Sequence, residues 1–437
     1  MTKHFVKQTS ILFLTSLILL SQLPLTIKAS TDLNINADAA ILVDADSGEI
    51  LYKQNEDQPL GIASMTKMMT EYLVLEAIAS GKITWEQPYT VSDKVYALAN
   101  APGLSNVPLR ENEAYSVKEL YEAMVIKSAN GASIALAEIV AGSEGEFVRL
   151  MNRKAAELGL EHYQFVNSTG LSNYDMFGLH PEGTGFNDEN LLSAQDTATL
   201  AYHLLNDYPE LLQTANLSSE TFREGTSEEL VMKNTNAMLQ GRKYEYAGID
   251  GLKTGTTPFA GSTFTGTAER DGTRYITVIM NSKDAQNQPS SGERFIQTGM
   301  LLDFGYNSFG LVDFSLADYD QDLPRTIEVA DGEKESLSFT ANDTIQLKMN
   351  KSQKENVNLT LIMDESKLDE DGKLQAPVEK GEKIGELLIE NPQEYEWVDK
   401  PLFEKYTIDV FAEEAVEKSN WFVLTSQAIG DFFKKLF

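Results

Sequence analysis

The sequence has no cysteine, four histidines, and far fewer basic than acidic residues. Without cysteine, disulfides, thiol catalysis and cysteine-ligated metals are all excluded. The 36 lysines and arginines stand against 66 aspartates and glutamates, and the formal charge of −30 argues against nucleic acid as a partner. None of the histidines (His4, His162, His180, His203) pairs with another at ligand spacing. We interpret the last three as structural and expect no metal and no cofactor.

The length and the apolar content indicate a soluble globular protein with more than one domain. A chain of 437 residues is too long for one compact core, and 42% hydrophobic residues with 9% aromatics is ordinary for globular proteins.

Residues 1–29 have the pattern of an export signal. Lys3 and Lys7 form a basic start, 11–25 is a mostly apolar run without a charge, and Ala29 is a small residue at the expected cleavage position. An uncleaved anchor is the alternative, but the run is short for a membrane-spanning helix. We therefore expect a signal peptide and a mature protein that works outside the cytoplasm.

Ser64 and Lys67 are separated by three positions at the predicted start of a helix. This spacing places a hydroxyl and an amine on one helix face, one turn apart. The amine can serve as a base for the hydroxyl if burial and a second cation lower its pKa from ~10.4. An exposed capping serine and a solvated lysine would give the same spacing, so the pair needs support from elsewhere.

Two later motifs provide that support. Ser128-Ala-Asn130 interrupts two apolar helix patterns, and buried polar side chains need partners, so we expect a loop facing a cleft. Lys253-Thr254-Gly255-Thr256 lies in a predicted strand in which Lys253 and Gly255 share a face. A mid-strand glycine marks a bulge or a close approach, here interpreted as approach by a carboxylate-bearing substrate.

Strand and helix patterns alternate through the first three hundred residues. A hairpin is predicted over 39–52, the Ser64 helix has a methionine-rich buried pattern, and a capping box at Ser116 opens the next helix. An antiparallel meander follows over 247–280, and a helix is expected over 293–303. From about residue 317 short alternating stretches (326–329, 344–349, 357–361, 384–389) predict a small antiparallel β-domain.

Residues 413–437 are expected to form an amphipathic helix that lies on a membrane. At 100° per residue, one half of the circumference is apolar, and five of its side chains are aromatic (Trp421, Phe422, Ala428, Ile429, Phe432, Phe433, Leu436, Phe437). This segment is too polar to span a bilayer and fits an interfacial anchor. A helix docked on the protein's own surface is the alternative.

Taken together and in this order, Ser64-x-x-Lys67, Ser128-Ala-Asn130 and Lys253-Thr-Gly255 are far more specific than any one of them. Sets of this type occur in penicillin-binding proteins and class A β-lactamases. The chain resembles the low-molecular-mass penicillin-binding proteins that are serine-type D-alanyl-D-alanine carboxypeptidases. The resemblance covers residues 39–306, the β-rich domain and the terminal helix.

The resemblance implies acyl transfer. Ser64 attacks the carbonyl between two D-alanines, Lys67 takes its proton, Ser128 relays a proton to the leaving amine, and Asn130 binds the peptide. Lys253 holds the terminal carboxylate with Thr254 or Thr256, beside Gly255, and the backbone N–H groups of Ser64 and Thr256 form the oxyanion hole. The implied partners are peptidoglycan stem peptides and, as covalent inhibitors, β-lactams.

The expected fold is α+β: a penicillin-binding/β-lactamase-like domain with an antiparallel sheet and helices at 30–315, then an all-β domain at 316–412 and the terminal helix. The expected location is the outer face of the cytoplasmic membrane. A serine β-lactamase is one alternative, although no Glu-x-x-Leu-Asn motif lies between Asn130 and Lys253. A catalytically silent wall-binding or scaffold protein is the other.

Overall fold

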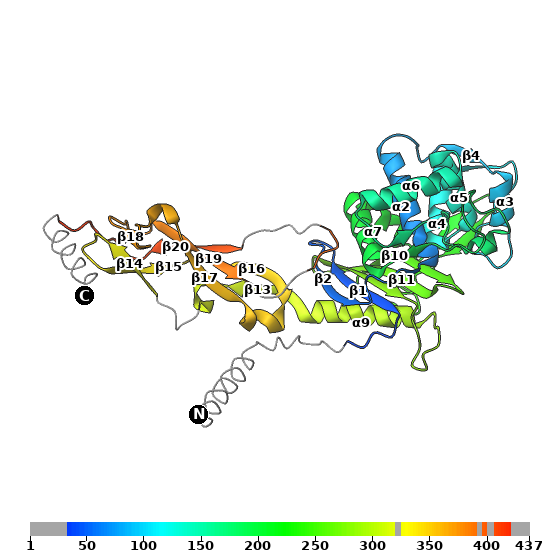
Figure 1. Ribbon diagram of the computed structural model, residues 1–437. Coiled ribbons are helices and arrows are strands. Elements are labelled where there is room, and N and C mark those ends of the chain that lie inside the picture. The colour runs from blue at the N-terminus through cyan, green and yellow to red at the C-terminus, as the bar shows by residue number, and fades with distance from the viewer. Residues whose placement is uncertain (1–32, 320–324, 391–395, 400–405, 421–437) are drawn as a thin grey trace, which may run out of the picture. The chain divides into compact units, whose positions relative to one another are not determined.

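A computed structural model describes residues 33–319, 325–390, 396–399 and 406–420 (Figure 1). The predicted signal peptide at 1–29 lies outside the described residues, as do positions 421–437 of the predicted terminal helix.

A five-stranded antiparallel sheet in the order β10-β11-β12-β1-β2 forms the base of the predicted catalytic domain. The predicted hairpin and meander are both present, and β1 joins them by pairing with β12 from Ala39–Met280 to Asp44–Tyr275. The strands are β1 (Ala39–Asp44), β2 (Ile50–Gln54), β10 (Ile249–Thr257), β11 (Gly261–Arg270) and β12 (Thr273–Met280).

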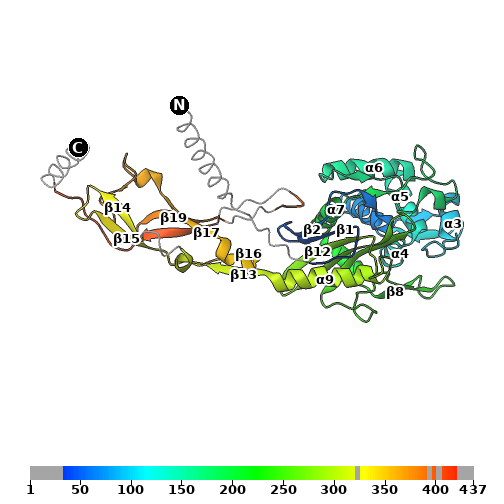
Figure 2. The same ribbon diagram turned by 60° about the horizontal axis from the view of Figure 1, so that its bottom comes forward.

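Helices cover both faces of this sheet. α9 (Glu293–Ser308) packs on β11 and β12, whereas α7 (Ala194–Asp207) packs on β12 and β1 from the other side (Figures 1 and 2). All six residues of β1 are buried. A strand covered on both faces has no solvent side, which explains why its sequence is a continuous apolar run rather than an alternating one.

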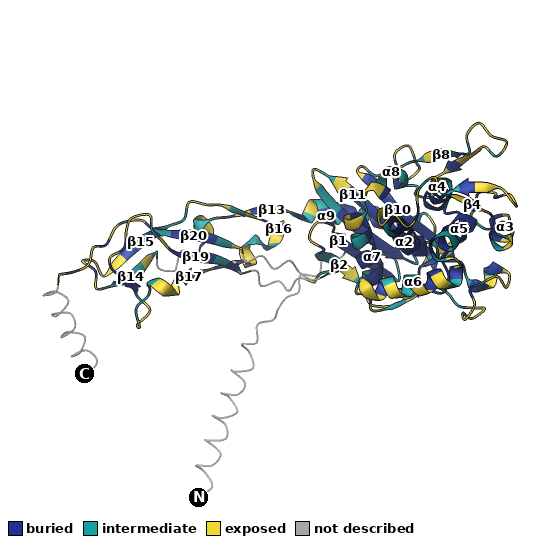
Figure 3. Ribbon diagram, turned by 90° about the horizontal axis from the view of Figure 1, so that it is seen from above, coloured by how far each residue is buried: buried dark blue, intermediate teal, exposed yellow. Residues whose placement is uncertain are grey.

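The methionine-rich helix α2 (Lys67–Ala79) lies inside a helical cluster, with α4, α5, α6 and α7 against it. Every residue from Lys67 to Leu75 is buried, as the dark ribbon of α2 shows (Figure 3), so the prediction of a core helix is confirmed. The other helices of this part are η2 (Ala63–Thr66), α3 (Asp93–Ala99), α4 (Val117–Lys127), α5 (Asn130–Ala141), α6 (Glu144–Glu157), η3 (Asn173–Met176), η4 (Pro209–Leu211) and α8 (Leu212–Ala215).

Three small sheets complete this part. They are β4 (Pro88–Thr90) with β5 (Ala114–Ser116), β8 (Ser219–Phe222) with β9 (Leu230–Lys233), and the three strands β3 (Leu60–Gly61), β7 (Leu191–Leu192) and β6 (Tyr163–Gln164).

The C-terminal part is all-β, as predicted from the alternating stretches. A six-stranded sheet has the order β17-β19-β20-β15-β14-β18, and β13 pairs with β16. The bounds are β13 (Phe309–Phe314), β14 (Thr326–Ala330), β15 (Ser336–Thr340), β16 (Ile345–Asn350), β17 (Asn358–Met363), β18 (Leu374–Gln375), β19 (Lys383–Glu390) and β20 (Thr407–Ala412), with 3-10 turns η5 (Leu316–Asp318), η6 (Lys351–Asn356) and η7 (Glu365–Lys367).

The structure shifts both predicted limits of the β-domain. Val312 and Phe314 on β13 belong to its apolar cluster, so it begins before residue 316. At the other end, the helix predicted from Glu413 is wrong for 413–420. Val416 forms a β-bridge with Val378, and Lys418 forms one with Gly332. These residues therefore extend the β-domain.

Candidate active site

The short turn η2 carries Ser64, and α2 starts at Lys67 directly after it. The Lys67 side chain is 1% exposed. Its Nζ lies 3.0 Å from Ser64 Oγ and 2.8 Å from Asn130 Oδ1, and it is 2.5 Å from the backbone oxygen of Thr169. Three of the predicted site residues therefore meet at one nitrogen atom.

The surroundings of Lys67 favour its neutral form. Burial lowers the pKa of the Lys67 amine well below its usual value, and the positive charge of Lys253 lowers it further. A neutral amine has two N–H donors and one lone pair. Asn130 Oδ1 and Thr169 O are acceptors only, so they take the two N–H groups and leave the lone pair for the Ser64 hydroxyl.

Ser128 and Asn130 come from the junction of α4 and α5. Ser128 ends α4 in the left-handed conformation, with φ 60°, and α5 begins at Asn130. Ser128 Oγ is buried and has no hydrogen-bond partner among the residues that the structure describes. An unpaired buried hydroxyl is costly, so this one is suited to meet a ligand.

Lys253 lies on β10 and is 3% exposed. Its Nζ donates to the carbonyl of Thr254 at 3.3 Å. Burial lowers the pKa of Lys253 to about 7; Glu71 raises this pKa, and Arg294 lowers it. Within the described part no hydrogen bond links Lys253 to Ser64 or Lys67, so its effect on Lys67 is electrostatic.

The two threonines of this motif have different environments. Thr254 Oγ1 donates to Thr235 Oγ1 at 2.8 Å and is largely buried. Thr256 is exposed, and its Oγ1 accepts from Nη1 of Arg294 at 2.9 Å. Thr256 is therefore the one that is accessible to a ligand.

Gly255 does approach another backbone, but that backbone belongs to the same protein. A Cβ at this position would lie 2.6 Å from Ile62 O and 2.4 Å from Thr263 Oγ1. This glycine therefore makes room for the backbone directly before η2. It allows β10 to pack against η2, which brings Lys253 and Ser64 to the same region.

The sequence did not indicate two components of the site. Arg294, in the first turn of α9, donates from Nη1 to Gly255 O at 2.7 Å, and burial lowers its pKa to about 10. Thr169 contributes a main-chain oxygen from a connection without regular structure, and a carbonyl has no residue signature. An arginine at the start of a helix also has no pattern that marks it for a site 39 residues away in the chain.

Comparison with known proteins agrees with the family resemblance. The family model described as D-alanyl-D-alanine carboxypeptidase matches residues 26–284, and that of the penicillin-binding protein 5 C-terminal domain matches 314–418. The D-alanyl-D-alanine carboxypeptidase DacF of Bacillus subtilis is 29% identical over 93% of this chain and 92% of its own length. DacC of Escherichia coli is 30% identical over 81% and 80%.

Solved structures of penicillin-binding proteins are also similar to this chain. A peptidoglycan synthesis regulatory factor (PBP3) of Streptococcus pneumoniae is 34% identical, with a TM-score of 0.66 over 87% of this chain and 99% of that one. Penicillin-binding protein D2 of Listeria monocytogenes, determined in its cefotaxime-bound form, is 30% identical with a TM-score of 0.52, over 62% and 98%. The chain therefore belongs to the family of serine-type D-alanyl-D-alanine carboxypeptidases.

Proposed function

We propose that this enzyme removes the terminal D-alanine from peptidoglycan stem peptides through an acyl-enzyme on Ser64. The observation that carries the proposal is the Lys67 amine, which is buried, has a lowered pKa and is 3.0 Å from Ser64 Oγ. A base with a lowered pKa beside a hydroxyl is what an activated serine nucleophile needs.

Acylation proceeds by attack of Ser64 Oγ on the carbonyl carbon between the two D-alanines, while its proton passes to Lys67 Nζ. The developing oxyanion is held by the backbone N–H groups of Ser64 and Thr256. Collapse of the tetrahedral intermediate breaks the C–N bond, and the leaving amine takes a proton relayed by Ser128 Oγ. Water then adds to the acyl carbon, Lys67 takes its proton, and Ser64 leaves as the free hydroxyl.

The terminal carboxylate binds beside Lys253 and Thr256. Two cations, Lys253 and Arg294, lie on this side of the site, and burial lowers the pKa of both. A bound carboxylate favours the charged form of Lys253, so it offsets the desolvation of that amine. Thr256 Oγ1 accepts from Arg294 and donates to Gly255 O in the free enzyme, and on binding its hydroxyl turns to the same carboxylate.

The alternatives have less support. A serine β-lactamase would need a group that activates water for rapid deacylation, and the Glu-x-x-Leu-Asn motif is absent from the sequence. A silent scaffold protein has no use for a buried lysine hydrogen-bonded to both a serine and an asparagine. β-Lactams are therefore expected to acylate Ser64 and to remain bound as inhibitors.

Export and membrane attachment belong to the same proposal. The pattern of 1–29 supports a cleaved signal peptide, and the apolar half-face of 421–437 supports an interfacial helix at the outer face of the cytoplasmic membrane. Of the helices that the structure describes, none has the length and hydropathy to cross a bilayer.

The test is release of D-alanine from a soluble pentapeptide that ends in D-Ala-D-Ala. Wild-type enzyme is expected to release one D-alanine per peptide and to leave the tetrapeptide intact, whereas Ser64→Ala releases none. Rapid turnover of penicillin without peptide hydrolysis would instead establish a β-lactamase.

A further inference from the structure

One of the two acceptors that orient Lys67 is a main-chain atom. Asn130 Oδ1 is the first, and the second is the carbonyl oxygen of Thr169, 2.5 Å from Nζ. The lone pair of neutral Lys67 points toward Ser64 only while both acceptors are in place. The position of the Thr169 peptide is therefore a condition for proton transfer.

Thr169 belongs to a tight turn, Asn167–Gly170, which is buried throughout. Asn167 Oδ1 accepts from the backbone N–H groups of Thr169 at 3.0 Å and Gly170 at 2.8 Å. Asn190 Oδ1 in turn accepts from the N–H of Asn167 at 3.2 Å. These bonds fix the local shape of the turn, and Asn190 Nδ2 links it to the residue before α2 by donating to Asn167 O at 2.9 Å and to Thr66 Oγ1 at 2.8 Å.

Ser168 attaches the turn to the helices around it. Its carbonyl accepts from Thr70 Oγ1 on α2 at 2.8 Å and from Ser133 Oγ on α5 at 2.7 Å. Its N–H and its Oγ both donate to Oε1 of Glu144, at 3.0 and 2.7 Å. Glu144 is the acceptor for both donors of the residue that precedes Thr169.

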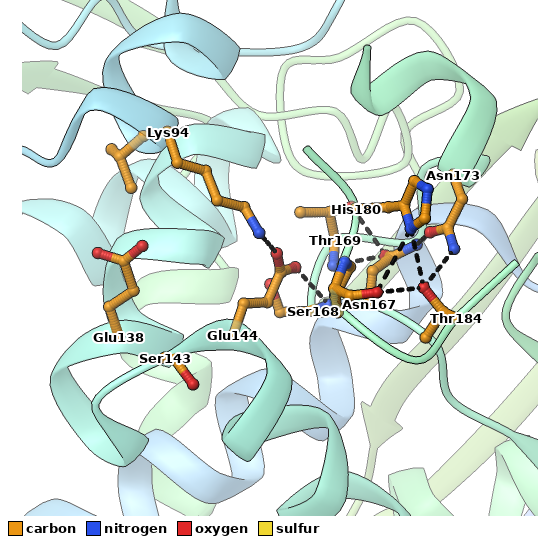
Figure 4. A network of polar contacts seen from close by, with 12 residues as sticks. Lys94, Glu138, Ser143, Glu144, Asn167, Ser168, Thr169, Asn173, His180 and Thr184 are labelled. Carbon is orange, nitrogen blue, oxygen red and sulfur yellow. Dashed lines mark hydrogen bonds and ion pairs between the residues drawn. The ribbon is translucent and has the colours of Figure 1, made fainter. Parts of the chain in front are cut away.

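The Glu144 carboxylate lies between this turn and Lys94. Figure 4 shows Ser168 on one side of it and Lys94 of α3 on the other. Glu144 Oε2 is 2.6 Å from Lys94 Nζ, as an ion pair without hydrogen-bond geometry, and the carboxylate side chain is 1% exposed. Buried carboxylates in proteins are paired with other groups. The partners of Glu144 are the two donors of Ser168 and the amine of Lys94 on α3.

Helix capping does not account for Glu144. The N-cap of α6 is Ser143, whose side chain accepts from the backbone N–H of Glu146. The negative charge of Glu144 could stabilise α6 by its position at the helix N-terminus. An exposed carboxylate would do the same without the cost of burial. Its orientation toward Ser168 requires another explanation.

We propose that Glu144 is a positioning residue for the base Lys67, acting through the Ser168–Thr169 peptide. The carboxylate holds Ser168 by two donors, and the next carbonyl along the chain then holds one N–H of Lys67 and directs its lone pair to Ser64. This proposal rests on the proposed role of Lys67 as base, and it assigns Glu144 no contact with the substrate.

The experiment is a series of variants in the full-length enzyme, assayed for acylation by a chromogenic penicillin across concentrations. Glu144→Ala is expected to lower the saturating acylation rate constant about 10- to 100-fold, with the half-saturating concentration changed less than about 2-fold because the substrate contacts remain. Glu144→Gln keeps an oxygen that accepts both Ser168 donors, and we expect it to retain a rate within about 3-fold of wild type. Rates are expressed per acylatable enzyme, so partial unfolding does not mimic the effect.

Glu146→Ala is the matched control, since Glu146 is on the same helix but exposed and paired with Arg149. We expect wild-type kinetics from it. A Glu144→Ala enzyme with a wild-type rate constant, or one in which only the half-saturating concentration changes, overturns the positioning role. If Glu144→Ala does not fold, Ser168→Ala removes one of the two donors, and an unchanged rate constant in that variant overturns the proposal equally. Absence of acylation in the wild type would reject the proposed function itself.

Discussion

A Cβ placed on Gly170 would lie 1.8 Å from the carbonyl oxygen of Ala63. The Asn167–Gly170 turn and the Ser64 turn are therefore in contact through backbone atoms, although more than one hundred residues separate them in the sequence. Gly170 also has φ +78°, a conformation that side chains disfavour. This contact places the Thr169 carbonyl beside Lys67, whose amine also contacts Ser64.

Gly170→Ala should disrupt this arrangement. The methyl group clashes with main chain rather than with a flexible side chain, so we expect a loss of at least about 2 kcal/mol in the free energy of unfolding and strongly reduced acylation by penicillin. Gly178→Ala is the control, because Gly178 has φ +81° but open space at its Cβ. Urea unfolding that gives equal losses for the two variants would contradict the importance of the contact.

The residues around this contact differ in how far their roles could be predicted from the sequence. The proximity of Ser64 and Lys67 was predictable because their spacing is fixed by local helix geometry, whereas the inclusion of Asn130 rested on the resemblance to a known family. Thr169 acts through its carbonyl, which has no signature in the sequence, and the mid-strand Gly255 indicated a close approach but not which segment approaches. Arg294 is brought to the site by the packing of α9 on the sheet, which is a long-range property.

Lys253→Ala should impair substrates with a free terminal carboxylate more than their methyl esters. Loss of a buried charge partner typically costs 2–5 kcal/mol, so we expect kcat/KM for the carboxylate substrate to fall at least about 30-fold relative to the ester. An equal loss for both substrates would show that Lys253 acts only through the pKa of Lys67.

The lowered pKa of Lys253 predicts that KM of the wild type for a carboxylate substrate depends on pH. Its pKa is about 7 in the free enzyme, so it loses its proton as the pH rises through that value. KM for the carboxylate substrate should therefore increase above about pH 7, whereas KM for the ester should not. Parallel pH profiles of KM for the two substrates would exclude this role.

Glu71, one turn after Lys67 on α2, should make stability depend on pH. Burial raises the pKa of Glu71 to about 7, although its hydrogen bond from Tyr121 and the charge of Lys253 lower it. The folded protein then binds a proton more tightly than the unfolded chain does. This contribution is fully present below about pH 4.5 and is lost as pH rises through about 7, on the order of 3 kcal/mol at ~1.4 kcal/mol per pKa unit.

Glu71→Gln keeps the acceptor for Tyr121 and removes the titration. We expect similar stability to wild type at pH 4.5 and higher stability than wild type at pH 8, measured by urea unfolding at both values. Glu76→Gln, on the same helix but paired with Lys154 at the surface, should show no comparable change between the two pH values. If the Glu71→Gln difference does not grow with pH, the buried carboxyl is not protonated in the native state.

Removal of residues 421–437 should release the mature enzyme from membranes. Each well-buried aromatic side chain contributes about 1.5–3 kcal/mol, and Lys434 and Lys435 add attraction to anionic lipid. Truncation after Asn420 keeps the bridge of Val416 to Val378 and the hydrogen bond of Ser419 to Gly332. We expect a soluble protein with an unchanged rate on a small D-Ala-D-Ala peptide, checked by vesicle flotation and by D-alanine release.

Two outcomes would contradict the role of residues 421–437 as a membrane anchor. A truncated protein that still floats with anionic vesicles places the attachment elsewhere. A truncated protein that is soluble but hydrolyses peptide more slowly indicates a helix docked on the enzyme. Glu substitutions at Lys434 and Lys435 in the full-length protein separate the lipid contribution, because they should weaken flotation without affecting hydrolysis.

The predicted start of this tail at Glu413 illustrates why boundaries are difficult to read from sequence. At 100° per residue Val416 falls in the polar half of the helical projection, and its side chain is buried in the β-domain beside β-strand neighbours. The apolar face of the predicted helix therefore does not include this residue, and the pairing of its backbone with Val378 places it in the β-domain. The same holds for Val312 and Phe314, whose partners on β16 lie more than thirty residues away.

The central claim is that Ser64 is the nucleophile and Lys67 its base. Mass spectrometry of the intact enzyme after brief incubation with a penicillin tests it most directly, followed by peptide mapping of the adduct. We predict one penicilloyl group on Ser64 in the wild type and no adduct in Ser64→Ala, or in Lys67→Arg, because a guanidinium cannot be deprotonated to act as base. An adduct on another residue, or labelling of Ser64→Ala at the wild-type rate, would contradict the account.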